Sequence, residues 1–83
     1  MKTCYITFRS VTFGQRGQRL LERAGISCTL QRTPRWMEQQ GCGYYLKLRE
    51  EDCRRGTELL RSNGVSFRKV YQQLGQEMLE VFL

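Results

Sequence analysis

An internal duplication limits what this chain can fold into more than any other feature. Residues 20–27 (LLERAGIS) resemble residues 59–66 (LLRSNGVS) in the leading leucine pair, the glycine and the apolar residue and serine after it, and Gly17 falls on Gly56 at the same offset. Each copy indicates the end of a helix, a glycine at the helix stop and then a strand. The duplication therefore predicts two related structural units within one small domain.

A strand is also predicted before each helix, over residues 3–9 and 43–49. Apolar residues alternate with polar ones in both segments and again in residues 26–30, as in half-buried strands. The order is β-α-β twice. We predict an α+β domain of the ferredoxin-like split βαββαβ type, with a four-stranded antiparallel sheet and two helices on one face. The domain is expected over residues 1–73.

The two predicted helices each carry a glycine in the middle of the inward face. Gly17 shares its face with Phe13 and Leu20, while three arginines line the opposite side. A glycine in a helix costs about 1 kcal/mol. We expect Gly17 and Gly56 to allow a close approach of helix and sheet.

Residues 74–83 form an apolar C-terminal extension outside this minimal fold. Leu74, Met78, Val81 and Phe82 have helical spacing, and the segment is too apolar to be left in water. It is expected as a short helix or an oligomerisation segment, packed on its own sheet or on a second subunit. A homodimer or higher homo-oligomer follows from the second alternative.

Charge and composition exclude several kinds of site. The 83 residues include 14 Lys and Arg, 8 Asp and Glu and no His, for a net charge of +6. Without His, the chain lacks a Ser-His-Asp triad, a Cys-His dyad and any imidazole metal ligand. This excess of basic residues favours binding to a nucleic acid or to an acidic partner protein. No signal peptide or membrane span is evident, so we expect a cytoplasmic protein.

Four cysteines are present, and no two of them form a C-x-x-C pair. In a reducing cytosol we expect free thiols. Cys4, Cys28 and Cys53 lie on faces that also carry apolar residues, so they are predicted core residues. No metal site and no cofactor are expected.

Cys42 differs from the other cysteines because it stands between Gly41 and Gly43, at the end of a connector of about a dozen residues. The glycines would expose the thiol, and Arg32 and Arg35 in the same connector would lower its pKa. The alternative is a tight turn into a strand, with Cys42 pointing inward in phase with the core. Both interpretations remain open at this point.

A family resemblance enters with several short motifs in a fixed order. They are Phe8-Arg9-Ser10, Ala24-Gly25-Ile26, Thr33-Pro34-Arg35, Gly41-Cys42-Gly43 and Val70-Tyr71. In this order the chain resembles the selenium/sulfur carrier protein-like family, a group of small bacterial domains, over roughly residues 5–71. The chain departs from the usual pattern at Trp36 and Met37, which would cover the thiol or dock a partner.

The resemblance implies that Cys42 carries sulfur or selenium as a persulfide or perselenide, in a carrier and not an enzyme. Its partners would be a cysteine desulfurase, a sulfurtransferase or a selenophosphate-forming enzyme. Gly41, Gly43, Arg32 and the run Thr33-Pro34-Arg35 would form the binding loop, in which Pro34 fixes the backbone and Arg35 supplies a guanidinium. Pro34 as an ordinary turn residue and Arg35 as a solvated cation are the plain alternatives.

RNA binding is the second hypothesis, because RNA-recognition domains share this layout and stack bases on aromatics of an open sheet face. Tyr5 and Tyr45 are predicted on that face. Residues 40–47 only partly match the RNA-recognition motif, since Gln40 replaces its basic residue and Lys47 its last aromatic.

Overall fold

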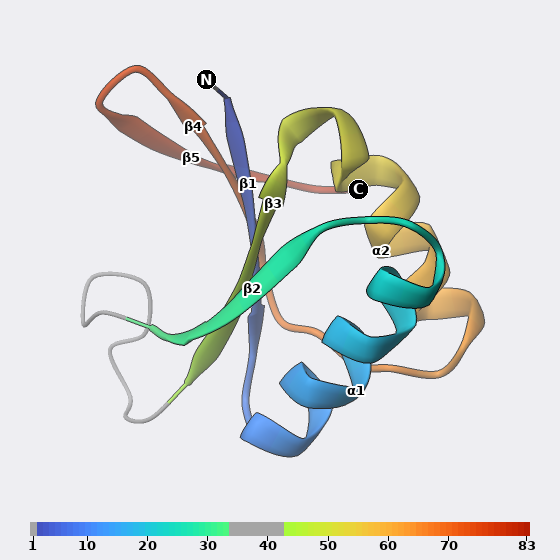
Figure 1. The fold of residues 1–83 in the computed structure, drawn as a ribbon. Helices are drawn as coiled ribbons and strands as arrows, with labels where there is room; N and C mark the ends of the chain where they lie inside the picture. Colours follow the sequence, from blue (N-terminus) through green and yellow to red (C-terminus); the bar gives the residue numbers. More distant parts are fainter. Residues whose placement is uncertain (1, 34–42) are drawn as a thin grey trace.

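The computed structural model describes residues 2–33 and 43–83. Within these residues, two α-helices pack on one face of a five-stranded sheet (Figure 1). The elements in chain order are β1 (Thr3–Phe8), α1 (Val11–Arg23), β2 (Cys28–Arg32), β3 (Tyr44–Arg49), the 3-10 turn η1 (Glu50–Asp52), α2 (Cys53–Ser62), β4 (Val70–Leu74) and β5 (Glu77–Val81).

The strands lie in the order β2-β3-β1-β4-β5, and each neighbouring pair is antiparallel. The α+β class, the antiparallel sheet and the two helices agree with the sequence prediction. The prediction of four strands is wrong, because the C-terminal segment adds a fifth. The ferredoxin-like arrangement stays a prediction.

The fifth strand, β5, arises from a turn at Gly75, where the backbone φ of +61° favours glycine. Leu74 pairs with Glu77 across this turn, and Val70 pairs with Val81 at the far end of the hairpin. The helical spacing of the extension therefore predicts the wrong element. Val81 and Leu83 pack against the core, so part of the segment's apolar surface is hidden within its own chain.

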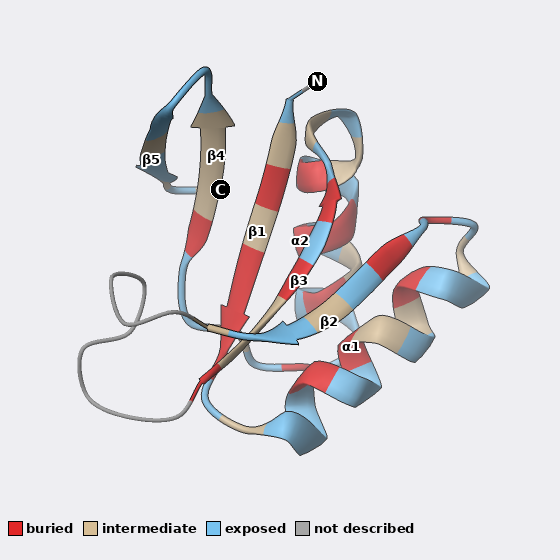
Figure 2. Ribbon diagram, turned by 60° about the vertical axis from the view of Figure 1, so that its left-hand side comes forward, coloured by how far each residue is buried: buried red, intermediate tan, exposed pale blue. Residues whose placement is uncertain are grey.

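The core lies between the sheet and the two helices (Figure 2). In β1 the side chains of Cys4, Ile6 and Phe8 are fully buried, as the alternating pattern predicts. Leu46 on β3 and Leu60 on α2 are fully buried as well.

Gly17 allows α1 to lie close to its neighbours. A Cβ atom added at this position would lie 3.1 Å from Phe8 Cζ, 3.2 Å from Leu60 Cδ2 and 3.3 Å from Leu46 Cδ1. At Gly56 an added Cβ would lie 3.3 Å from Leu48 Cδ1. The expected close approach of helix and sheet is therefore confirmed at both glycines.

The two copies of the duplication diverge after their glycine stops. Gly25 and Gly64 have φ values of +82° and +70°, so both left-handed helix stops are confirmed. β2 begins three residues after Gly25, whereas β4 begins only at Val70. The strand expected directly after Gly64 is replaced by an irregular segment, residues 65–69.

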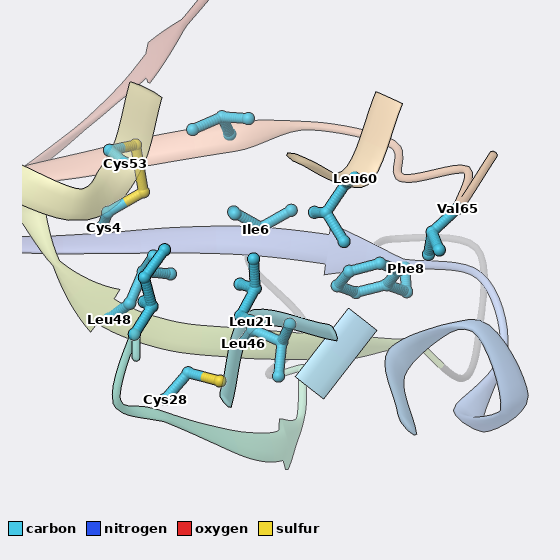
Figure 3. Close-up of a cluster of buried hydrophobic side chains, with 12 residues drawn as sticks. Cys4, Ile6, Phe8, Leu21, Cys28, Leu46, Leu48, Cys53, Leu60 and Val65 are labelled. Atoms are coloured by element: carbon cyan, nitrogen blue, oxygen red, sulfur yellow. A yellow bond between two sulfur atoms is a disulfide. The ribbon is translucent and has the colours of Figure 1, made fainter. Parts of the chain in front are cut away.

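A disulfide joins Cys4 on β1 to Cys53 at the start of α2, with 5.8 Å between their Cα atoms (Figure 3). Both residues are core residues, as predicted, and are at most 1% exposed. The expectation of four free thiols is therefore wrong. Strand alternation and helix periodicity place each cysteine inward, but they do not show that the two face each other.

Candidate functional site at the loop end of the sheet

β1 ends, β2 ends and β3 begins at the same edge of the molecule, which we call the loop end of the sheet. Phe8, the last residue of β1, pairs with Tyr44, the first residue of β3. The Thr33 N–H donates a hydrogen bond of 2.9 Å to the Gly43 carbonyl oxygen, beyond the last β2–β3 pair. The described chain therefore stops at Thr33 and resumes at Gly43, and these two residues are hydrogen-bonded to each other.

The structure brings together three of the predicted site residues, Arg32, Thr33 and Gly43. Gly43 is buried and Arg32 is exposed, with its guanidinium carbon 5.9 Å from the centre of the Tyr44 ring. Thr33 Oγ1 is buried and, among the described residues, has no hydrogen-bond partner. Pro34, Arg35, Trp36, Met37, Gly41 and Cys42 lie outside the described residues.

Cys28 is the free cysteine of the described part of the chain. It is 7% exposed, and its Sγ lies 3.9 Å from the Gln18 carbonyl oxygen, to which the thiol donates. Burial, together with the negative charge of Glu22, raises the pKa of Cys28 to about 11. Because the thiolate is the nucleophilic form, Cys28 is unsuited to attack a sulfur donor at neutral pH.

The open face of the sheet carries the tyrosine pair of the RNA hypothesis. The Tyr5 and Tyr45 rings lie 5.3 Å apart in an edge-to-face arrangement. Tyr5 Oη donates to Gln73 Oε1 at 3.0 Å, and Tyr45 Oη donates to Gln31 Oε1. Burial and the neighbouring Tyr5 raise the pKa of Tyr45. The hydroxyls and ring edges are thus engaged within the protein.

Sequence reasoning missed a hollow at the loop end, on the other side of β1 from β3. Its volume is about 520 Å³, and it is lined by Arg9, Phe13, Ser66, Phe67, Arg68 and Lys69. Phe13 is 36% exposed here, so its expected inward orientation is wrong. It lies in the first turn of α1. A second hollow of about 400 Å³ shares Ser66, Phe67 and Arg68 and extends to Arg61. We call the two together the cationic groove.

In the sequence, the run Phe8-Arg9-Ser10 could have indicated this groove, because Arg9 directly follows Phe8, the fully buried last residue of β1. The other half of the groove was hidden because residues 65–69 were expected to be strand. Among the described residues, none that lines either hollow is acidic.

Neither a metal centre nor a membrane helix is found in the described part of the chain. Its Cys, Asp and Glu side chains do not gather in any group of three or more that could hold a metal ion. None of its helices has the length and apolar character needed to cross a bilayer.

The fold and the cysteines define a small α+β domain in which the three cysteines that the structure describes are buried, two of them in a disulfide. The family model described as "Putative Se/S carrier protein-like" matches residues 3–72. The chain therefore belongs to this family, as the motifs predict. No curated protein and no solved structure gives a significant match. RNA binding finds no support in these comparisons.

Proposed function

We propose that this protein carries sulfur or selenium on Cys42 and relays it between partner enzymes. One observation carries the proposal most directly: the other three cysteines are unsuited to the task. Cys4 and Cys53 are buried in a disulfide, and the pKa of buried Cys28 is about 11. Cys42 is the remaining cysteine of the chain, and the family match includes it.

Loading would be a thiol exchange without a metal or a redox cofactor. The Cys42 thiolate attacks the terminal sulfur of a persulfide on a cysteine desulfurase. A Cys42 S–S bond forms, the donor S–S bond breaks, and the donor leaves as a thiolate. Sulfur oxidation states balance, and the proton stays on the transferred sulfur. Transfer of selenium from a donor perselenide follows the same balance.

The surroundings of the connector favour an anionic thiolate and an anionic cargo. Arg32 ends β2 directly before Thr33, and Arg35 belongs to the same connector. Positive charge near a thiol lowers its pKa and raises the thiolate fraction. We propose that Thr33-Pro34-Arg35, together with Gly41 and Gly43, forms the loop that presents Cys42.

The test is mass spectrometry of the protein after incubation with a cysteine desulfurase and cysteine. We expect a mass gain of one sulfur, located on Cys42 by peptide mapping under non-reducing conditions. The Cys42→Ser variant should lose this gain, and the Cys28→Ser variant, its matched control, should keep it. Sulfur spread evenly over the cysteines, or kept in Cys42→Ser, would contradict the proposal.

Self-association is a second part of the proposal. Leu74 and Leu79 are 41% and 43% exposed on the β4–β5 hairpin, and Phe82 directly after β5 is 88% exposed. A second copy would cover this apolar surface. Light scattering should show a dimer or larger oligomer that Phe82→Ser weakens, whereas a monomer at all concentrations would exclude this part.

A further inference from the structure

We propose that the cationic groove binds an acidic peptide segment of a partner protein, namely the enzyme that delivers sulfur or selenium to Cys42. The identity of the partner rests on the proposed function. The binding chemistry rests on the groove alone, and the test below keeps the two apart.

The charged residues that the structure describes in the lining of the groove are all basic. Arg9, Arg68 and Lys69 line the larger hollow and Arg61 lines the smaller one, and all four residues are exposed. Lys69 Nζ also lies 3.9 Å from Glu80 on β5. An exposed ion pair of this kind contributes little to stability, so an incoming carboxylate can replace it.

The backbone that carries these cations is held in place by Thr7. The Thr7 N–H donates to the Lys69 carbonyl oxygen at 2.9 Å, and the Arg68 N–H donates to the Thr7 carbonyl oxygen at 2.7 Å. The Lys69 N–H donates to Thr7 Oγ1 at 3.0 Å. Arg9 follows Thr7 by two residues. The side chains of Arg9, Arg68 and Lys69 are therefore attached to neighbouring stretches of hydrogen-bonded backbone. Such preorganisation reduces the entropy lost on binding.

The shape of the groove favours a peptide over a compact anion or a nucleic acid. The two hollows adjoin along residues 66–68 and present their cations over an extended stretch of chain, whereas a single phosphate needs donors that converge on one point. Phe13 and Phe67 add apolar walls suited to side chains that flank an acidic run. The Arg61 guanidinium carbon lies 5.2 Å from the Phe67 ring centre, so a base could not stack freely on that ring.

The groove lies close to Gly43, the residue that directly follows Cys42 in the chain. β1 separates residues 68–69 on one side from Gly43 and Tyr44 on the other. Tyr45 and Lys69 lie on opposite sides of Thr7, so two strand spacings, about 10 Å, separate them, and Gly43 precedes Tyr45 by two residues. A segment docked in the groove would hold its own protein against the loop end of the sheet, where Cys42 would be loaded.

The binding test uses a fluorescein-labelled octaglutamate peptide as the probe. In amide NMR spectra of the ¹⁵N-labelled protein, the peptide should shift the resonances of Arg9 and of residues 66–69. Shifts confined to the open face of the sheet would overturn the proposal. Affinity is then measured by fluorescence anisotropy at fixed ionic strength.

A matched pair of double variants separates the groove from general electrostatics. Arg9→Glu with Arg68→Glu should weaken peptide binding about tenfold or more. Arg16→Glu with Arg19→Glu makes the same charge change on the exposed side of α1 and should have a much smaller effect. Equal weakening by both would overturn the proposal, as would tighter binding of octauridylate RNA or displacement of the peptide by millimolar inorganic phosphate.

The Cys42→Ser variant keeps failure of this inference distinct from failure of the proposed function. Peptide binding should be unchanged in this variant, because the substitution removes none of the cations of the groove. If Cys42 accepts no sulfur while the peptide binds in the groove, only the proposed function fails. If Cys42 is loaded while the peptide fails to bind, only the groove assignment fails.

Discussion

Thr7 and Lys69 are 62 residues apart in sequence and are joined by three hydrogen bonds. The Thr7 backbone N–H donates to the Lys69 carbonyl oxygen at 2.9 Å. The Thr7 hydroxyl group also donates to this oxygen, at 3.3 Å, and accepts from the Lys69 N–H at 3.0 Å. Thr7 is 3% exposed and is thus one of the few buried polar side chains of the described residues. This contact attaches the irregular segment 65–69 to the central strand just before β4 begins.

Thr7→Val should therefore destabilise the protein and loosen the cationic groove. Valine has nearly the same shape but leaves the part-buried Lys69 N–H without its acceptor, which costs about 1 kcal/mol. Urea unfolding should show this loss, and hydrogen exchange at the Lys69 amide should become faster. Thr7→Ser keeps the hydroxyl and should keep that amide protected. A protected Lys69 amide in Thr7→Val would contradict the role given to the hydroxyl.

Reduction of the Cys4–Cys53 disulfide should lower the free energy of unfolding. The bond closes a loop with a sequence separation of 49 residues, for which the restriction of the unfolded chain is worth about 4 kcal/mol. Dithiothreitol should therefore lower the urea midpoint of the wild-type protein, whereas the Cys4→Ala/Cys53→Ala double variant should not respond. Thiol titration of the unfolded, unreduced protein should find only Cys28 and Cys42. A count of four free thiols would show that the disulfide is not formed.

The local parts of the fold could be predicted from the sequence. Apolar alternation gives the buried face of β1, and the glycines at 25 and 64 give the two helix stops, because each signal depends on neighbouring residues alone. The disulfide could not be predicted in this way, because it depends on how β1 and α2 lie relative to each other.

The C-terminal segment and the groove show why periodicity alone is insufficient. Leu79, Val81 and Leu83 also alternate as in a strand, and the turn at Gly75 decides between the two patterns. Phe13 is in phase with the buried face of α1, yet it lies in the first turn, where it lines the groove instead of the core. For the candidate site, the sequence predicted a binding role for Arg32, Thr33 and Gly43, and that role stays a prediction. It did not predict the hollow that Arg9 and the segment 66–69 line.

The two glycines of α1 should respond differently to alanine. Alanine improves helix propensity by about 1 kcal/mol at either position. At Gly17 the new methyl group would meet Phe8, Leu46 and Leu60 at 3.1–3.3 Å, and all three are fully buried. Overpacking of this kind costs about 1–3 kcal/mol, so Gly17→Ala should destabilise the protein on balance.

Gly14→Ala is the matched comparison for Gly17→Ala. Its new methyl group would meet only the end of the Leu30 side chain, at 2.7 Å. Leu30 is half-buried on the edge strand β2 and can change rotamer at small cost. Urea unfolding should therefore rank Gly14→Ala above Gly17→Ala in stability. The reverse order would contradict the close packing of α1 at Gly17.

Cys28 should resist alkylation at neutral pH and should make the stability depend on alkaline pH. Its pKa of about 11 leaves about one thiolate in a thousand at pH 8, so iodoacetamide should label native Cys42→Ser protein slowly and urea-unfolded protein fast. In the unfolded chain Cys28 ionises near its ordinary pKa of 9.0. Between pH 9 and about 11 the unfolded state therefore binds fewer protons than the folded state, and the free energy of unfolding falls as pH rises.

The Cys28→Ala variant isolates this contribution from the titration of lysines and tyrosines over the same range. The stability difference between the wild-type protein and Cys28→Ala should be constant below pH 9 and should shrink as the pH rises toward 11, since only the wild-type protein has the Cys28 thiol, which ionises more readily in the unfolded state. Urea unfolding at closely spaced pH values measures this difference. A difference that stays constant across the range, together with fast labelling of the native protein at pH 8, would show that Cys28 ionises freely and would remove the ground for excluding it as the carrier.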